Sequence, residues 1–207
     1  ELFQFCSIGE DPQDKKYAGE STRLEIGDRN RIREFCTIHR GTVQDGGVTR
    51  IGHDNLLMAY CHVAHDCQVG NHTVLANAAS MAGHVRLGDW AILGGFTIVH
   101  QFCRIGAHSF AAMGSAISKD VPPYLMIGGQ PAQPHGINAE GLRRRGFDAQ
   151  QLAHIKRAYK LLYQSGLRLE QAISEIEATC MDCQEIQTFV QFLRASQRSI
   201  VRTKSGV

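Results

Sequence analysis

The chain has 207 residues and a formal net charge of +2 at pH 7. This length suits one large domain, or one domain with a small appendage, and the near-neutral charge gives no indication of nucleic-acid binding. No apolar run approaches the roughly 20 residues that cross a membrane, and no signal peptide is evident. The 21 glycines and single tryptophan are typical of a fold with many tight turns rather than of a helical bundle.

Seven cysteines are scattered along the chain, and their number is odd. This pattern favours reduced thiols in a cytoplasmic protein over a disulfide framework. The sequence begins at Glu1 in the middle of a repeating pattern, so we expect further N-terminal residues to precede it.

The first 50 residues contain the start of a six-residue pattern and two interruptions. Ile26, Ile32 and Ile38 are six residues apart. The polar segment 11–23 separates Ile8 from Ile26, and the segment GTVQDGG (41–47) delays the next repeat. Because loops that project from a rigid scaffold often carry function, we expect a functional loop at 11–23.

Between residues 51 and 117 an apolar residue recurs at every sixth position. The series is Ile51, Leu57, Val63, Val69, Leu75, Met81, Leu87, Leu93, Val99, Ile105, Ala111 and Ile117. From Cys61 onward the residue two positions earlier is small, and side chains two apart in a strand share a face, so both sets point inward. The pattern resembles the hexapeptide repeat, which implies a mainly β fold, the left-handed parallel β-helix.

The segment CHVAHDC, residues 61–67, combines two cysteines with two histidines and an aspartate. The repeat places Cys61 and Cys67 inward, whereas His62 precedes an inward valine and therefore points outward. His65 and Asp66 fall at the turn that follows. Because the sulfur atoms and the imidazoles face opposite sides of the wall, one tetrahedral zinc site cannot collect both.

The six-residue pattern ends after Pro122 and Pro123, and helical periodicity follows. We expect a β-helix over residues 1–125, a connecting segment over 126–146 and an α-helical domain over 147–207. Apolar stripes predict helices over 148–164, 169–180 and 183–197. Cys180 and Cys183 lack a second cysteine pair, so no metal site is expected there.

Several of the ten histidines recur on successive coils of the predicted prism. His62, His65, His84 and His100 fall on one wall or its adjoining corner, in coils about 4.8 Å apart. We predict that His65 acts as a general base with Asp66, since a carboxylate fixes the imidazole tautomer and raises its basicity. The sequence has no Gly-x-Ser-x-Gly or Walker motif, which favours direct group transfer over a covalent enzyme intermediate.

More specific motifs extend across essentially the whole chain: QDKKYAGE, RIREFCTIHRGT, HVAHDC, MAGHV, HQFCRIGAH, DVPPY and NAEGLRRRGF. Together they resemble the UDP-N-acetylglucosamine O-acyltransferases, which begin lipid A synthesis in bacteria with an outer membrane. The resemblance implies transfer of an (R)-3-hydroxyacyl group from acyl carrier protein to the sugar 3-hydroxyl. It implies a homotrimer with clefts between subunits and no cofactor, the donor being a thioester on the phosphopantetheine arm of the carrier.

The resemblance also assigns roles to residues in these motifs. His65 corresponds to the general base, Asp66 to the carboxylate that orients it, and the N–H of Gly83 to an oxyanion donor. The residues implied at the sugar and acyl site are Asp14, Lys16, His62, His84 and Gln101. Those implied at the UDP group are Asn138, Glu140, Arg144 and Arg145, and His39 and His100 are further correspondences.

Met113 stands where family members that accept longer acyl chains carry glycine, at the base of the acyl groove. A methionine side chain fills part of such a groove, so we expect a shorter donor, on the order of ten carbons. The alternative is that Met113 turns inward and fills the core.

The tail is rich in basic residues: Arg143, Arg144, Arg145, Lys156, Arg157, Lys160 and Arg168. Such a run is ordinarily a solvated face. Because the implied carrier protein is acidic, these cations are expected to raise its rate of association.

Other functions remain open at the level of the sequence. His62, His65 and His84 could hold zinc, as in the trimeric carbonic anhydrases of the same fold. A hexapeptide prism can also be a non-catalytic scaffold subunit, which would have no need of a His65–Asp66 pair. The acyltransferase that acts on a sugar 2-amine is a close relative, and the acceptor atom, a 3-hydroxyl or a 3-amino group, is not determined.

Overall fold

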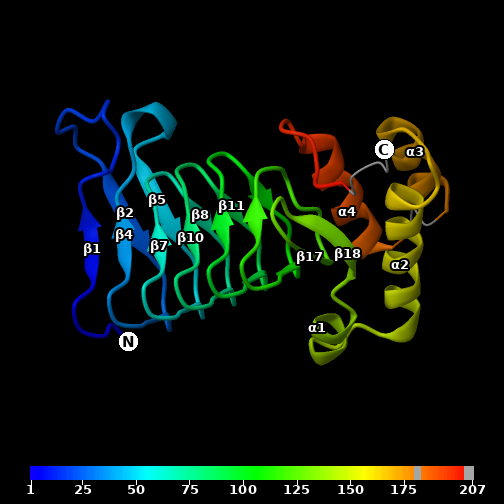
Figure 1. Cartoon of the computed structure of the whole chain (residues 1–207), viewed down its shortest axis with the longest axis horizontal. Helices are drawn as coiled ribbons and strands as arrows, with labels where there is room; N and C mark the ends of the chain where they lie inside the picture. The colour runs from blue at the N-terminus through cyan, green and yellow to red at the C-terminus, as the bar shows by residue number, and fades with distance from the viewer. Residues whose placement is uncertain (180–182, 203–207) are drawn as a thin grey trace.

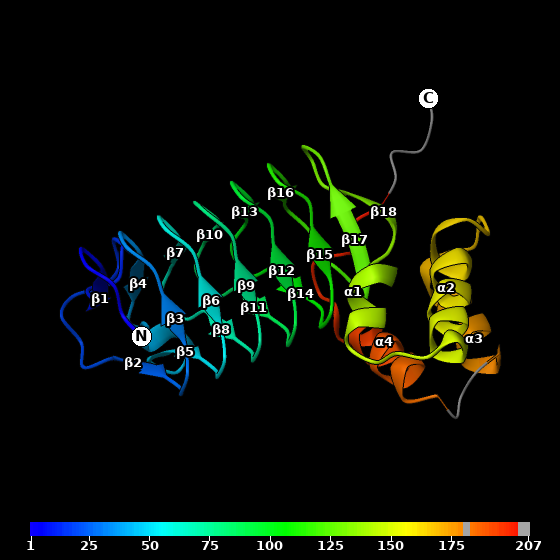
Figure 2. The ribbon, with the colours of Figure 1, turned by 90° about the horizontal axis from the view of Figure 1, so that it is seen from below.

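The computed structural model describes residues 1–179 and 183–202, in which a narrow three-sided prism leads into a group of helices (Figure 1). The prism is built from short strands that follow one another around its three sides (Figure 2). The predicted fold class, a left-handed parallel β-helix followed by α-helices, is confirmed.

The first strands flank the two interruptions of the repeat: β1 Ser7–Glu10, β2 Arg23–Ile26, β3 Arg31–Ile32, β4 Thr37–His39 and β5 Val48–Ile51. The segment 41–47 contains a short 3-10 helix, Val43–Asp45. The uninterrupted repeat then gives strands of two residues each: β6 Leu56–Leu57, β7 His62–Val63, β8 Gln68–Val69, β9 Val74–Leu75, β10 Ser80–Met81, β11 Arg86–Leu87, β12 Ile92–Leu93, β13 Ile98–Val99, β14 Arg104–Ile105, β15 Phe110–Ala111 and β16 Ala116–Ile117.

Strands from successive coils pair in register and form three walls. The first wall is β1-β4-β7-β10-β13-β16, the second is β2-β5-β8-β11-β14, and the third is β3-β6-β9-β12-β15-β17-β18. On the first wall, for example, His62 pairs with Ser80 and Ser80 with Ile98. Outward side chains at equivalent positions therefore stack in columns along the prism, about 4.8 Å apart.

The inward side chains fill the prism as the repeat predicts. Leu57 is 1% exposed, and Met81 is completely buried. The small inward position includes Cys67 and Cys103, which are free thiols with no exposed surface. Burial raises the pKa of Cys67 to about 12 and that of Cys103 to about 11, so both thiols stay protonated at neutral pH.

The expectation of reduced thiols holds for the described cysteines of the prism but not for the helical tail. Cys6, Cys36 and Cys61 are free thiols, like Cys67 and Cys103. Cys183 is disulfide-bonded, so the prediction of a reduced thiol is wrong at this position. Cys180 lies outside the described residues.

The corner between the first and second walls is formed by residues with positive φ. Asp66, His84 and Phe102 have φ values of 60°, 64° and 65°. This region is uncommon for residues that carry a Cβ, and contacts between successive corners support it here. The rings of His84 and Phe102 stack with centroids 4.3 Å apart. Side chains from consecutive coils thus line up on one edge of the prism.

The third wall continues beyond the end of the six-residue pattern. β17, Leu125–Gly128, pairs in parallel with β15, and β18, Gln133–Ile137, pairs antiparallel with β17. α1, Ala139–Arg144, follows directly. The segment 126–146, expected as a connection, therefore holds most of β17 together with β18 and α1.

Three further helices complete the described chain: α2 Ala149–Tyr163, α3 Leu169–Thr179 and α4 Gln184–Ala195. Asp148 and Gln151 form a capping box at the start of α2. Ile155, Ile173 and Phe189 come from the three helices and are at most 1% exposed, so the helices share one apolar core. None of the described helices is both long and apolar enough to span a membrane.

The two leucines of β6 test the assignment of inward and outward faces. Leu57→Ala should lower the free energy of unfolding by about 2–5 kcal/mol, because a fully buried side chain leaves a cavity. Leu56→Ala removes the outward-facing side chain of the same strand and should lower the free energy of unfolding by less than about 1 kcal/mol. Urea unfolding followed by circular dichroism measures both variants, and equal losses would contradict the assignment.

Candidate active site

A cavity of about 390 Å³ lies on the first wall, next to the edge that this wall shares with the second wall. Its lining includes Gln13, His39, His62, His65, Gly83 and Gln101. These residues come from β4 and β7, from the turns after β7, β10 and β13, and from the loop 11–23. The stacking of coils thus brings together residues that are up to 88 positions apart (13 to 101).

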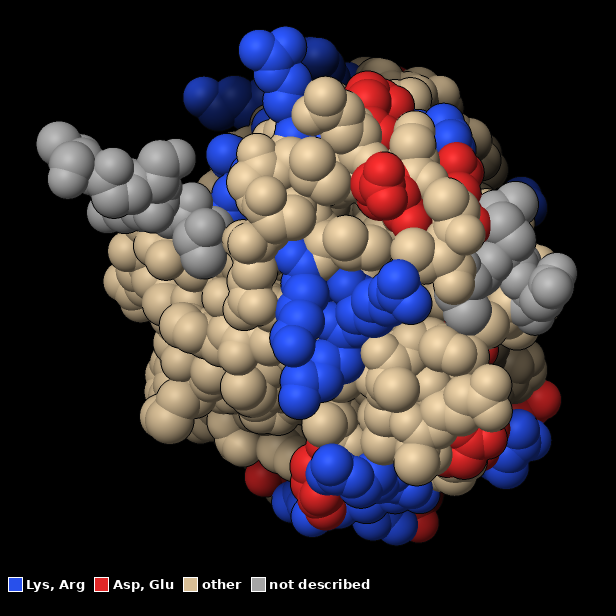
Figure 3. Space-filling view, turned by 90° about the vertical axis from the view of Figure 1, so that its right-hand side faces the viewer, with Lys and Arg blue, Asp and Glu red and all other residues tan. Residues whose placement is uncertain are grey.

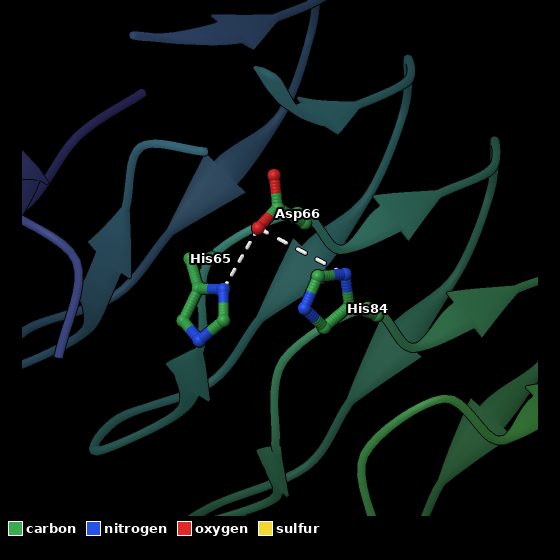
Figure 4. Close-up of side chains that lie close together, drawn as sticks. All are labelled: His65, Asp66 and His84. Atoms are coloured by element: carbon green, nitrogen blue, oxygen red, sulfur yellow. Dashed lines mark hydrogen bonds and ion pairs between the residues drawn. The ribbon is translucent and has the colours of Figure 1, made fainter. Parts of the chain in front are cut away.

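The turn after β7 folds the carboxylate of Asp66 back onto the ring of His65 (Figure 4). Nδ1 of His65 lies 2.8 Å from Oδ2 of Asp66. A carboxylate only accepts hydrogen bonds, so Nδ1 donates the proton and Nε2 of the neutral ring is left as a proton acceptor. The predicted pairing of these two side chains is therefore present in the structure.

Asp66 is held by the segments that precede it. Its side chain is completely buried. The backbone N–H and the hydroxyl of Thr42 donate to its two oxygens at 2.8 and 2.6 Å, and its own N–H donates to the hydroxyl of Thr49 at 2.8 Å. These hydrogen bonds offset the cost of burying a carboxylate and fix its orientation toward His65.

Gly83 faces the edge of the same imidazole. A Cβ at Gly83 would lie 2.6 Å from Cε1 and 2.8 Å from Nε2 of His65, so a side chain here would displace the ring. Within the described part of the chain the Gly83 N–H has no acceptor, while its carbonyl accepts from the N–H of Phe102 at 3.0 Å. A backbone donor beside Nε2 can stabilise an oxyanion that forms there.

His62 and His39 occupy the first wall beside His65. The hydroxyl of Thr37 lies 2.7 Å from Nδ1 of His62, and Nδ1 of His39 lies 2.7 Å from the carbonyl oxygen of Asp11. Burial, reinforced by the neighbouring histidines, lowers the pKa of His62. His62 is therefore a neutral imidazole at physiological pH, suited to hydrogen bonding with a neutral polar group.

His84 lies at the corner one coil beyond Asp66 and faces the other side of the edge. Its ring contacts that of His65 edge-to-face at 5.1 Å. Its Nδ1 lies 3.0 Å from Oδ2 of Asp45 and 3.9 Å from Oδ2 of Asp66. Asp45 and Thr42 both belong to the insertion 41–47, and the sequence analysis did not single them out. The interruption of the repeat is the sequence signal that could have identified them.

His65, Asp66 and His84 are the group in this corner whose ligand atoms could surround a metal ion, lying within 4.8 Å of one another. His62, which completes the zinc-binding alternative, is not part of this group. The Asp66 carboxylate already accepts hydrogen bonds from Thr42 and His65. A metal at this point would have to replace the hydrogen bond that makes Nε2 of His65 a base.

The loop residues Asp14, which is half-buried, and Lys16, which is exposed, do not line the cavity. The backbone N–H of Lys16 donates to the Asp14 carboxylate at 3.0 Å. Gln13 does line the cavity, so the loop reaches the site through a residue that the sequence analysis did not single out. His100 is exposed beside Gln101, and its Nδ1 lies 3.2 Å from the Gln101 carbonyl oxygen.

The residues predicted for the UDP group lie on α1 and at its two ends. Asn138 caps α1 and donates to the carbonyl of His108 at 2.9 Å. His108 forms the corner between the second and third walls, whereas His65 lies between the first and second walls. Arg145 stacks on Trp90, with its guanidinium 5.3 Å from the ring centroid. Within a single chain, the residues predicted for the UDP group and the cavity at His65 therefore lie at different corners of the prism.

Glu140 and Arg144 are exposed and form an ion pair of 3.1 Å on α1. Because the pair is exposed to solvent, it contributes little stability and leaves both side chains accessible.

Met113 lies at the corner between the third and first walls, with 77% of its surface exposed. The alternative that Met113 fills the core is therefore wrong. Phe96 and Ile98, one coil earlier, are 66% and 56% exposed. An apolar strip thus extends from the first wall to this corner.

Comparison with known proteins shows which family the chain belongs to. The model for the second domain of UDP-N-acetylglucosamine O-acyltransferase matches residues 120–201, and the bacterial transferase hexapeptide model matches residues 49–83. An acyl-[acyl-carrier-protein]–UDP-N-acetylglucosamine O-acyltransferase of Thiobacillus denitrificans is 58% identical over 201 residues, which are 97% of this chain and 78% of that relative. The chain belongs to the UDP-N-acetylglucosamine O-acyltransferase family. It is an acyltransferase, as its motifs predict.

Solved structures of this family share the fold across nearly the whole chain. The Acinetobacter baumannii enzyme superposes with a TM-score of 0.95 at 49% identity and covers 97% of this chain and 78% of its own. The UDP-N-acetylglucosamine acyltransferase of Francisella novicida gives a TM-score of 0.94 at 43% identity, over 99% of this chain and 75% of its own.

His108 gives the stability of this family member a predictable pH dependence. Burial, with a further contribution from Arg145, lowers the pKa of His108 to about 4. In the unfolded chain, His108 binds its proton near pH ~6.5. As the pH falls from about 6.5 to about 4, the unfolded state therefore gains a proton that the folded state does not bind, and the free energy of unfolding decreases. Above about pH 6.5 His108 is neutral in both states and has no such effect. His108→Gln should therefore reduce the loss of Tm between pH 7 and pH 5, measured by circular dichroism. His53→Gln, an exposed histidine, is the control, and equal pH dependence in both variants would contradict this assignment.

Proposed function

We propose that this chain transfers an (R)-3-hydroxyacyl group from acyl carrier protein to the 3-hydroxyl of UDP-N-acetylglucosamine, the first step of lipid A synthesis, in the cytoplasm. Family membership and the names of the similar proteins support the reaction. The single observation that carries the mechanism is the His65 ring, which is bound through Nδ1 to a buried carboxylate and presents Nε2 beside Gly83.

His65 acts as the general base in a direct transfer. Nε2 takes the proton of the sugar hydroxyl while that oxygen attacks the thioester carbonyl carbon. The Gly83 N–H donates to the oxyanion of the tetrahedral intermediate, a contribution of about 2.7–4 kcal/mol in comparable sites. When the carbon–sulfur bond breaks, the imidazolium returns its proton to the departing thiolate, and Asp66 stabilises the charged ring in between. The chemistry requires no cofactor.

The substrate is held by two groups of residues. His62 and Gln101 line the cavity and contact the sugar and the acyl group. Asp14, Lys16 and His84 lie outside its lining and complete the sugar and acyl site once the substrate is bound. Asn138, Glu140, Arg144 and Arg145 bind the UDP group. Because this second group lies at a different corner, a second copy of the chain supplies it. The working form is therefore a homotrimer with its sites between subunits.

Two substitutions test the base. His65→Ala and Asp66→Asn should each lower kcat/KM by about 10²–10⁴-fold, the first by removing the base and the second by favouring the wrong tautomer. Transfer from an acyl carrier thioester to UDP-N-acetylglucosamine measures the rate, and His53→Gln is the matched control. A fully active, folded His65→Ala variant would reject the mechanism and favour a scaffold. Stoichiometric zinc in the purified protein would favour the carbonic anhydrase alternative.

The acyl chain extends from the cavity along the first wall. Ser80, Ile98 and Ala116 follow His62 in the outward column of this wall. Ser80 still lines the cavity, and the surface beyond it, at Ile98 and Ala116, is apolar. Met113 stands at the corner beside the last of these strands, three coil steps or roughly 14 Å from His62. Its exposed side chain limits the length of the groove, so the enzyme prefers a donor of about ten carbons.

Met113→Gly tests the limit on chain length. Removing the side chain should raise kcat/KM for a fourteen-carbon donor by about tenfold or more, while a ten-carbon donor is turned over at a similar or lower rate. The measurement compares the two carrier thioesters in wild type and variant. Equal preference for the two donors in the wild type would remove the proposal.

The helices form the docking surface for the acidic carrier protein. Lys156, Arg157, Lys160 and Arg168 are exposed and form no ion pair within the described residues. Figure 3 shows Lys and Arg side chains gathered on the end of the molecule that the helices form. Exposed cations that form no ion pair attract an acidic protein over a long range and raise its rate of association.

Charge reversal tests this surface. Arg157→Glu combined with Lys160→Glu should lower kcat/KM for the carrier thioester by about tenfold at low salt, because steering is lost. Lys119→Glu, an exposed lysine on the prism, is the control. The wild-type rate should fall with ionic strength and the variant rate should respond less. A flat salt response in the wild type would contradict the assignment.

A further inference from the structure

The outward column of the second wall is compensated by a carboxylate at one end only. Its members in register are Glu25, Arg50, Gln68, Arg86 and Arg104. Near the N-terminus Glu25 lies 2.8 Å from Arg50 and 2.6 Å from Arg23, so one carboxylate compensates part of the positive charge there. At the other end Arg86 is directly opposite Arg104, about 4.8 Å away along the column. Within the described residues, no carboxylate forms an ion pair with either arginine.

A cavity of about 600 Å³ lies between these arginines and the segment after α4. Arg198 lies across it from the wall, and Phe102, Asp45 and Asp120 also contribute to its lining. A second hollow of about 570 Å³ continues from Arg86 and Arg104 along α4. The arginine pair therefore stands at the centre of a continuous groove.

Two of the three guanidinium groups are held in place by neutral partners. Arg104 donates from Nη1 to the carbonyl of Ala195 at 2.7 Å and lies 4.9 Å from the ring centroid of Phe192. Arg198 donates from Nη1 to the carbonyl of Gln101 at 2.9 Å and lies 5.9 Å from the ring of Phe102. Each guanidinium has five N–H donors, so most of them stay available in a fixed orientation.

Both carboxylates of the cavity are engaged elsewhere. Asp120 is 1% exposed and accepts from the backbone N–H of Arg104 at 2.8 Å and from the hydroxyl of Ser196 at 2.7 Å. Asp45 lies 3.0 Å from Nδ1 of His84. Neither carboxylate forms an ion pair with the three arginines, whose positive charges outnumber the two carboxylates of the lining. An anion between Arg86 and Arg104 would reduce their mutual repulsion.

We propose that Arg86, Arg104 and Arg198 form a binding site for a phosphate group. Guanidinium forks match phosphate oxygens in bidentate geometry, and three of them surround one group. The phosphate is either a free anion or the phosphodiester of the donor's phosphopantetheine arm, and the latter possibility rests on the proposed function. The site lies on the second wall, whereas the cavity at His65 lies on the first wall.

Binding of pyrophosphate tests the site. Isothermal titration of the wild type should show saturable binding, and the double variant Arg86→Gln with Arg104→Gln should bind at least tenfold more weakly. Arg50→Gln removes the same charge from the same column, where Glu25 already compensates it, and should bind within about twofold of the wild type. Pyrophosphate should also raise the Tm of the wild type but not that of the double variant. No binding at millimolar concentration, or equal affinity in the double variant and the control, would overturn the proposal.

Kinetics distinguish the two sources of phosphate. If the site holds the donor arm, the double variant should raise KM for the carrier thioester about tenfold, and pyrophosphate should compete with that donor. If the site holds a free anion, KM for the donor is unchanged and pyrophosphate does not compete. Because the titration does not depend on acyl transfer, failure of the proposed function would leave its result intact.

Discussion

The structure depends on one packing constraint, the alternation of inward and outward side chains along strands that repeat every six residues. The inward set, with Leu57 and Met81 among its members, is almost completely buried and closes the prism. Each coil then stacks on the last by hydrogen bonds between parallel strands. Because these bonds fix the register, every outward position repeats in a column, and a column can concentrate one kind of chemistry on one wall or edge.

The candidate site uses this constraint at an edge. Consecutive corner residues, Asp66 and His84, adopt positive φ and stack along the prism, so a carboxylate and two imidazoles meet within one small volume. A buried carboxylate requires donors, and Thr42 supplies two of them. The regular coils place the side chains at this edge, and the insertion 41–47 donates the hydrogen bonds that hold the Asp66 carboxylate in place.

The outward columns also explain why charge is distributed unevenly over a chain of almost neutral net charge. On the second wall Glu25 forms ion pairs with its arginine neighbours at one end of the outward column, whereas Arg86 and Arg104 at the other end have no ion-pair partner among the described residues. On the first wall the column changes from His62 to Ile98, which is polar at the cavity and apolar beyond it. Adjacent surfaces of one prism can therefore suit an anion, a sugar and an acyl chain.

The sequence by itself determined the repeat, the inward direction of Cys67 and the pairing of His65 with Asp66, because six-residue periodicity and local turns act over short stretches of chain. It did not determine that Thr42 would bind the Asp66 carboxylate or that Asp45 would contact His84. These contacts join segments from different coils, and their positions follow from how the insertion 41–47 folds over the corner. The residues predicted for UDP lie near another corner because Asn138, which caps α1, is bonded to the His108 carbonyl, a contact that the sequence pattern does not show.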